Sequence, residues 1–143
     1  MANCENCSPD MSVYMNQTTA LLTPPSILTL QLKRFSCNAL TGKTTKDLTC
    51  VTCEKVLKFV LIDGRTASYK HIATVSHVGS YDDGGHYIAF TRLREDNCFE
   101  INDTVVTGPY EDIDIFDSLA LSGGGPHNKT PYILFYDLIS LEF

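Results

Sequence analysis

One histidine and one asparagine are the residues of this chain best suited to chemistry. His86 follows a glycine pair, and Asn102 ends a short apolar segment further along the chain. An imidazole that titrates near neutral pH can take a proton from a thiol and return it later. An amide oxygen beside the ring would fix which ring nitrogen carries the proton. These are the base and the orienting group that a cysteine nucleophile needs. A hydrogen-bonded histidine without a catalytic role and an ordinary Asn-Asp turn are the alternative interpretations.

Three expected strands must position this pair. Residues 68–77 alternate apolar and polar side chains, which predicts a strand that leads into a glycine-rich loop. Residues 87–93 form the next expected strand, and a polar turn joins it to a short strand over residues 98–101. Because that turn is short, the resulting hairpin would bring Asn102 back beside His86.

The rest of the chain also indicates strands, with no internal repeat and no long periodic helix. The alternation of leucines with polar residues predicts a strand with one buried face over 27–35, followed by a polar loop around residues 41–43. We also expect strands over 56–62, where Asp63-Gly64 makes a turn, and over 132–136. We predict that residues 108–128 are irregular, except for one short helix over 112–121. The chain is therefore strand-rich, with antiparallel neighbours.

Composition limits the class of protein. The 143 residues suit one domain, and 43% hydrophobic with 20% charged residues allows a packed core. A net charge of −6 argues against nucleic acid as a partner and suits a basic protein partner. No run approaches the roughly 18 to 20 apolar residues of a membrane span, and the N-terminus has no signal-peptide pattern. Six cysteines in such a chain are expected to be thiols or metal ligands. We therefore expect a protein of the cytosol or nucleus.

Five segments, in order along the chain, resemble conserved boxes of the ubiquitin-specific proteases, which are papain-like cysteine deubiquitinases. Together they cover most of the chain, and an ordered set is far more specific than any single box. The resemblance implies the C-terminal half of that family's catalytic domain. The five segments are Pro25 to Phe35 (a Leu-Lys-Arg-Phe strand), Tyr69 to Gly79, Gly85-His86-Tyr87-Ile88-Ala89 (a histidine box), Phe99 to Val106, and Pro131 to Tyr136.

The resemblance implies a fold and a set of roles. The fold would be α+β and mostly antiparallel β, corresponding to the palm and fingers half of a papain-like protease, with residues 1–143 as one partial catalytic domain. His86 would be the general base, Asn102 the third member of the triad and Asp103 an accessory polar group. Ubiquitin or a ubiquitinated protein would be the partner. The residues implied beside ubiquitin's C-terminal Gly-Gly are Asp83, Gly84, Gly85 and Tyr87, whose acidic loop would attract the basic tail.

The sequence departs from the family at the nucleophile. Nothing in the chain matches the family's cysteine box, and Cys98, where the family has tryptophan, is expected to be a packing residue. Covalent attack needs a thiolate, so we predict that the chain alone has no appreciable deubiquitinase turnover. Two hypotheses stay open. The chain is part of a thiol deubiquitinase whose cysteine lies on another segment, or it is a catalytically dead ubiquitin-binding module.

Two Cys-x-x-Cys pairs support a separate hypothesis. Cys4 with Cys7 and Cys50 with Cys53 have zinc-ribbon spacing, and tetrahedral zinc would need all four thiolates at one point. The resemblance puts the first pair where the family has one knuckle of a zinc ribbon, and it has no zinc pair at the second position. Two interpretations stay open for Cys50 and Cys53: metal ligands, or buried or surface thiols beside the strand over 56–62. Catalysis would need no cofactor in either case.

Overall fold

The computed structural model describes residues 2–3, 12–13, 18–51, 53–79, 84–93, 97–110 and 129–143. Within them the chain forms strands and no helix, so none of these residues offers a helix able to cross a membrane. The expectation of a mostly antiparallel β protein is confirmed, whereas the helical part of the α+β prediction is not. The short helix expected over 112–121 lies outside the described residues. The strands are β1 Ala2–Asn3, β2 Ser12–Val13, β3 Ile27–Gln31, β4 Phe35–Cys37, β5 Thr44–Lys46, β6 Val56–Val60, β7 Thr66–Val78, β8 His86–Arg92, β9 Cys98–Asn102, β10 Val105–Tyr110 and β11 Thr130–Glu142.

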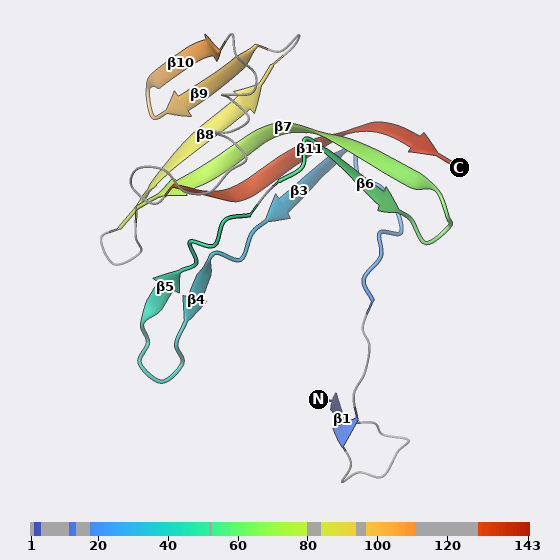
Figure 1. Ribbon diagram of the computed structural model, residues 1–143, viewed down its shortest axis with the longest axis horizontal. Helices are drawn as coiled ribbons and strands as arrows, with labels where there is room; N and C mark the ends of the chain where they lie inside the picture. The colour runs from blue at the N-terminus through green and yellow to red at the C-terminus, as the bar shows by residue number, and fades with distance from the viewer. Residues whose placement is uncertain are drawn as a thin grey trace.

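One seven-stranded antiparallel sheet makes up most of the described chain. Its strand order is β10-β9-β8-β7-β11-β3, and β6 also pairs with β7. The two longest strands, β7 and β11, run side by side through the sheet, and β8 to β10 continue it at one end (Figure 1). β8 pairs with residues 73–78 of β7, and β6 pairs with residues 66–70. Two further two-stranded sheets, β1-β2 and β4-β5, lie outside this order.

The core lies where β7 and β11 pair. Alternate side chains of a strand point to opposite faces of a sheet, so the apolar members of each strand share one face. Tyr136 is 1% exposed, and its hydroxyl donates to the carbonyl oxygen of Glu54, 2.8 Å away. This bond ties the sheet to the segment between β5 and β6. The buried apolar residues are Leu28, Leu61, Ala67, Tyr69, Phe90, Cys98, Leu134 and Tyr136.

The strand expected over 27–35 ends early, because the chain turns away from the sheet after Gln31. Arg34 is only 3% exposed. Its guanidinium donates to the carbonyl oxygens of Pro131, Asp47 and Thr49, which ties the chain after β3 to β11 and to the segment after β5. Phe35 then begins β4, and the hairpin of β4 and β5 extends away from the main sheet (Figure 1).

The expectation that residues 108–128 are irregular is wrong at its start. Residues 108–110 belong to β10, which pairs with β9 from Val105 onward. The pairing shifts register between Thr107 and Tyr110, so Pro109 lies at an irregularity on an edge strand. Proline is tolerated there because an edge position needs no ladder donor. The remainder of the expected irregular segment, 111–128, lies outside the described residues.

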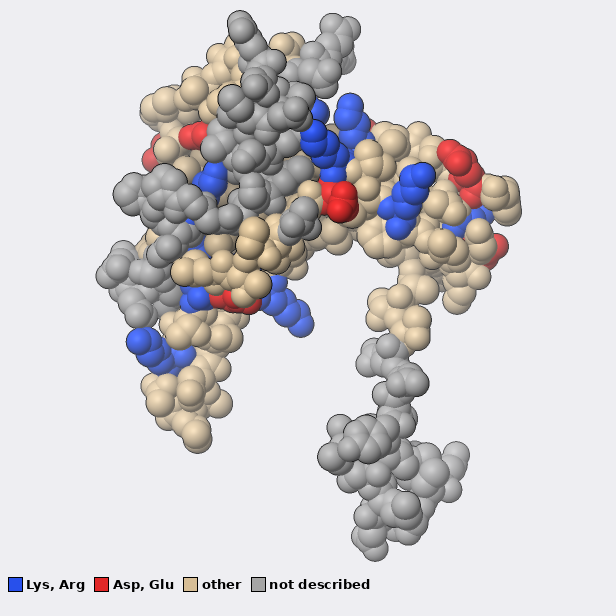
Figure 2. Space-filling model, viewed as in Figure 1, with Lys and Arg blue, Asp and Glu red and all other residues tan. Residues whose placement is uncertain are grey.

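Basic and acidic side chains are interspersed over the described part of the face in Figure 2, without a large patch of one sign.

Candidate functional site

The hairpin of β8 and β9 brings His86 and Asn102 together. His86 is the first residue of β8, and Asn102 is the last residue of β9. The register pairs Ala89 with Ile101, so Asn102 lies beside the start of β8, on the face to which His86 points. Nε2 of His86 lies 2.6 Å from Oδ1 of Asn102. This is the hairpin and the juxtaposition that the sequence predicted.

The bond between His86 and Asn102 fixes the proton on the ring. A carbonyl oxygen can only accept, so Nε2 of His86 donates to Oδ1 of Asn102. The lone pair is then on Nδ1, which is the nitrogen available to take a proton from another group. The side chain of His86 is 44% exposed, so this nitrogen is within reach of a ligand or of another segment.

Asp103 adds a carboxylate beside the same ring. It begins the tight turn between β9 and β10 with a positive φ of 52°, a conformation that aspartate tolerates better than most residues. Its Oδ2 lies 3.8 Å from Nε2 of His86, and its side chain is 77% exposed. At that distance and exposure the carboxylate contributes charge rather than a hydrogen bond.

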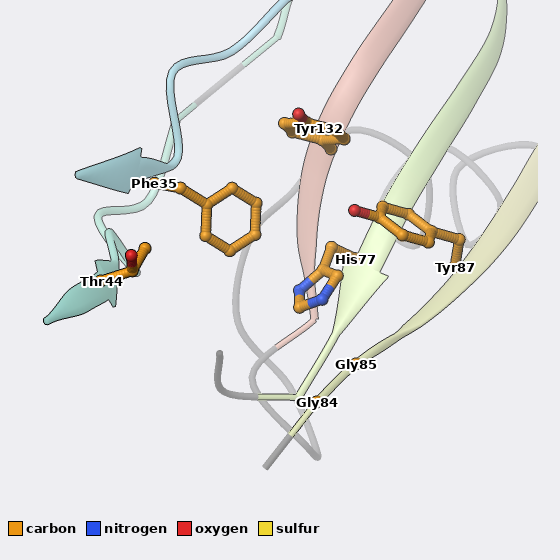
Figure 3. A pocket seen from close by; sticks show the side chains of 7 residues that line it. All are labelled: Phe35, Thr44, His77, Gly84, Gly85, Tyr87 and Tyr132. Atoms are coloured by element: carbon orange, nitrogen blue, oxygen red, sulfur yellow. The ribbon is translucent and has the colours of Figure 1, made fainter. Parts of the chain in front are cut away.

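A pocket of about 690 Å³ opens beside the start of β8 (Figure 3). Three aromatic rings and an imidazole face the same space, and Thr44 completes the wall on the side of the β4–β5 hairpin. Successive residues of a strand point to opposite faces, so Tyr87 points into the pocket and His86 to the other face. Gly84 and Gly85 precede both residues in the chain and also line the pocket. The lining residues are Phe35, Thr44, His77, Gly84, Gly85, Tyr87 and Tyr132.

His77 organises this pocket. Its ring makes edge contacts with Phe35 and Tyr87, at centroid distances of 5.2 and 5.0 Å. The residue is 4% exposed, and its Nδ1 is buried without a hydrogen-bond partner among the described residues. Burial, and next the ammonium of Lys46, lower the pKa of His77 below its ordinary value. The ring is therefore held neutral more readily than a histidine in water.

Gly84 and Gly85 each have a local structural reason to be glycine. Gly85 packs against His77, where a methyl group on Gly85 would overlap the imidazole. Gly84 has open space around it but a φ of +78°, which side chains rarely adopt. Both glycines therefore shape the route from β7 to His86.

Several predicted and several unexpected residues complete the site. Tyr87 is 50% exposed and lines the pocket, while Asp83, predicted beside it, lies outside the described residues. Sequence reasoning missed Phe35, Thr44, His77 and Tyr132 as pocket residues. His77 stood in the resembling segment that ends at Gly79, so its position before the glycine loop was the available signal. Tyr132 and Phe35 gave only an apolar strand pattern.

The described cysteines do not make a metal centre by themselves. Among the described residues no group of three or more His, Cys, Asp or Glu could hold a metal ion. Cys50 is exposed and Cys53 is half-buried, and burial is the main cause that raises the pKa of the Cys53 thiol. Cys4 and Cys7 lie outside the described residues, so the four-cysteine zinc site stays a prediction. Cys98 is fully buried in the core, as expected of a packing residue.

Comparison with known proteins gives a family match and a fold match. A family profile described as ubiquitin carboxyl-terminal hydrolase matches residues 1–136. A yeast SAGA DUB module structure with an Sgf73 mutant aligns with a TM-score of 0.72 at 24% identity, over 99% of this chain and 29% of that chain. The Ubp8–Sgf11–Sus1–Sgf73 module bound to monoubiquitin aligns with a TM-score of 0.68 at 25% identity, over the same shares. The Ubp8–Sgf11–Sgf73–Sus1 module aligns with a TM-score of 0.68 at 27% identity, over 86% of this chain and 26% of that chain. No curated protein matches the chain. The chain thus spans less than a third of the structures it aligns with.

Proposed function

The chain belongs to the ubiquitin carboxyl-terminal hydrolase family, and on that basis we propose that it is part of the catalytic domain of a thiol deubiquitinase. Residues 1–143 would be the C-terminal portion of that domain, the palm and fingers half of a papain-like fold. The observation that carries the proposal is the 2.6 Å contact between Nε2 of His86 and Oδ1 of Asn102. A base held in one tautomer by an amide is what a cysteine nucleophile requires.

In the proposed reaction His86 is the general base. Its Nδ1 takes the proton of a cysteine thiol, and the thiolate attacks the carbonyl carbon of ubiquitin's C-terminal glycine. The imidazolium returns the proton to the leaving amine, and a thioester forms. Water then loses a proton to Nδ1 as it attacks the thioester, which frees ubiquitin's carboxylate and the thiol. Asn102 holds the ring throughout, and the Asp103 carboxylate stabilises the imidazolium by Coulomb attraction.

The proposed substrate contact is ubiquitin's C-terminal tail. One of the aligned structures is bound to monoubiquitin, which supports ubiquitin as the partner. Gly84 and Gly85 have no side chains to block a diglycine, and Tyr87 offers an aromatic wall in the pocket beside them. Asp83 would contribute negative charge to a basic tail. We propose no nucleic-acid or membrane partner, and a location in the cytosol or nucleus.

The nucleophile would come from a segment outside the described residues. Cys98 is 0% exposed within the sheet, so its sulfur cannot reach a peptide carbonyl without unfolding β9. A second function follows if no such segment joins the chain: a ubiquitin-binding module without catalysis. Both functions use the same proposed contact with ubiquitin's C-terminal tail, and only the first includes hydrolysis of the substrate.

Titration of the isotopically labelled chain with ubiquitin tests the shared part of the proposal. We expect resonances of Gly85, His86 and Tyr87 to shift on addition of ubiquitin. Ubiquitin that lacks its last two glycines should shift them much less, because the tail no longer reaches the glycine pair. Equal shifts with both forms, or shifts confined to residues remote from the start of β8, would contradict the proposed site.

The zinc hypothesis has its own measurement. Zinc analysis of the purified chain, compared with Cys50→Ser and Cys7→Ser variants, would show whether both pairs hold one ion. One zinc per chain that is lost in both variants supports the four-cysteine site. Zinc that depends on Cys7 alone would leave Cys50 and Cys53 as ordinary thiols.

A further inference from the structure

Lys46 joins the β4–β5 hairpin to the turn that precedes His86. It is the last residue of β5, and its side chain is partly buried. Nζ donates to the carbonyl oxygen of His77 at 3.0 Å and to that of Gly79 at 2.9 Å. Two bonds from one ammonium to neighbouring carbonyls fix both the distance and the direction of the chain leaving β7.

The position of that chain is passed on to the start of β8 by direct packing. A methyl group on Gly79 would lie 3.3 Å from the carbonyl oxygen of Gly84 and 3.6 Å from Cα of Gly85, so these backbones are in close contact. Gly85 in turn packs against the ring of His77. His86 is the next residue. Gly79, the glycine pair and the ring of His77 therefore form one packed cluster directly before His86.

The β7–β8 register ends where Val78 pairs with His86. The two bonds from Lys46 reach the carbonyl oxygens of His77 and Gly79, on either side of Val78. Lys46 also anchors the hairpin that carries Phe35 and Thr44, the pocket wall facing Tyr87 and Tyr132 (Figure 3).

We propose that Lys46 is a positioning residue. It sets the spacing between the β4–β5 hairpin and the chain at Gly79, and it thereby holds both the aromatic pocket beside β8 and His86 in place. It would touch no reacting atom. The part that concerns ubiquitin affinity rests on the function proposed above, and the part that concerns the geometry of the turn does not.

Three variants separate this role from a general effect on stability. Lys46→Met keeps the length of the side chain and removes its donors, whereas Lys46→Arg keeps a cation with several donors. Lys58→Met makes the same chemical change at an exposed position on β6 and serves as the matched control. The measurements are amide hydrogen exchange along the chain, the ring resonances of His86, and ubiquitin affinity.

Lys46→Met should raise amide exchange about tenfold at residues 84–87, because each lost charge-assisted bond is worth roughly that factor or more. The His86 ring signals should shift or broaden, and ubiquitin affinity should fall about tenfold. Exchange in the middle of β7 and β11 should stay as in the parent chain. Lys46→Arg should restore most of the protection, and Lys58→Met should change none of the three.

Unchanged exchange and ring signals in Lys46→Met would overturn the proposal. A uniform rise in exchange over the whole sheet would also overturn it, since that is the signature of lost stability alone. Failure of Lys46→Arg to restore protection would count against the two hydrogen bonds as the cause. If the parent chain does not bind ubiquitin, the proposed function fails, while exchange and ring signals still decide the role of Lys46.

Discussion

His86 and Asn102 meet through one hydrogen bond, and that bond determines which ring nitrogen can act as a base. Nε2 must carry the proton because Oδ1 of Asn102 only accepts. Nitrogen-15 spectra of the neutral ring should therefore show mainly the Nε2–H tautomer. In Asn102→Leu the two tautomers should become mixed, because no acceptor selects between them.

Asn97→Leu is the matched control for that experiment. Asn97 is exposed and lies just before β9, at the opposite end of the strand from Asn102. Its replacement should leave the tautomer of His86 unchanged. A parent chain with Nδ1–H as the main tautomer would contradict the geometry described here and the proposed base with it.

A second residue-scale prediction concerns His77 and pH. Its pKa in the folded chain is lowered by burial and next by Lys46, so the unfolded chain binds the proton more tightly. The stability that His77 contributes is fully present above the unfolded pKa of about 6.5. It is lost as the pH falls from there toward the folded pKa. The unfolding free energy, measured with urea, should thus decrease between pH 7.5 and pH 5.

His77→Asn isolates this contribution from that of the other histidines. The variant should be less stable at pH 7.5, because it leaves space between Phe35 and Tyr87. Its unfolding free energy should nevertheless change less with pH than that of the parent chain. Equal pH dependence in the two proteins would show that His77 does not titrate on unfolding in this range.

At the scale of elements, the turn from β7 to β8 depends on the close approach of Gly85 to His77. Gly85→Ala would place a methyl group within the imidazole, and such overpacking costs about 1–3 kcal/mol. Gly64→Ala is the comparison, because Gly64 has a φ of +87° with open space around it. It should cost only about 1 kcal/mol of backbone strain.

The two glycine variants should differ most in ubiquitin binding. Gly85→Ala should lose it, since the start of β8 must move away from His77, whereas Gly64→Ala should keep it. Thermal unfolding and ubiquitin titration measure the two effects separately. Retention of ubiquitin binding by a folded Gly85→Ala chain would contradict the importance of this contact.

The bond from Tyr136 to the segment before β6 gives an element-scale prediction about stability. Tyr136 is buried, and burial is the first cause that raises its pKa to about 12. Tyr136→Phe should lower the unfolding free energy by about 1 kcal/mol, because the Glu54 carbonyl oxygen loses a donor. Tyr132→Phe loses only an exposed bond from Gln31 and should be close to neutral. Equal losses in both variants would show that the buried bond has no special weight.

Strands with one apolar face were predictable, and strands without that pattern were not. The sequence predicted β6 to β9 within about two residues at each end, and it predicted β3 and the middle of β11. It missed β4 and β5 because their side chains are mostly polar and none is buried, so no alternation signals a buried face. It predicted no strand over β10, where Gly108-Pro109 is typical of a turn.

The same limit applies to the site. Asn102 and His86 could be paired because a short hairpin connects them, and a local connection leaves few arrangements. Phe35 and Tyr132 lie far from His77 in sequence and meet it only through the pairing of β11 with β7 and the placement of the β4–β5 hairpin. No single strand pattern carries that information.

At the scale of the whole molecule, the two parts of the proposed site lie on opposite faces of the sheet. His86 lies on one face at the end of the sheet, and the aromatic pocket opens on the other face beside the same glycines. The structures with this fold are more than three times as long as the segment they share with the chain. Under the proposed function, the thiol would lie on a segment that packs against the end of the sheet bearing His86.

The proposed function predicts how activity depends on a cysteine box. The chain alone, incubated with a ubiquitin C-terminal fluorogenic substrate, should release no fluorophore above background, because nothing in its sequence matches the cysteine box that would supply the attacking thiolate. A polypeptide that joins the chain to a cysteine box should release it. In that polypeptide His86→Ala should reduce kcat about 10²–10⁴-fold, the usual contribution of a general base. Lys58→Met should leave the rate unchanged. Robust release by the chain alone, abolished by His86→Ala, would show instead that one of its own cysteines is the nucleophile.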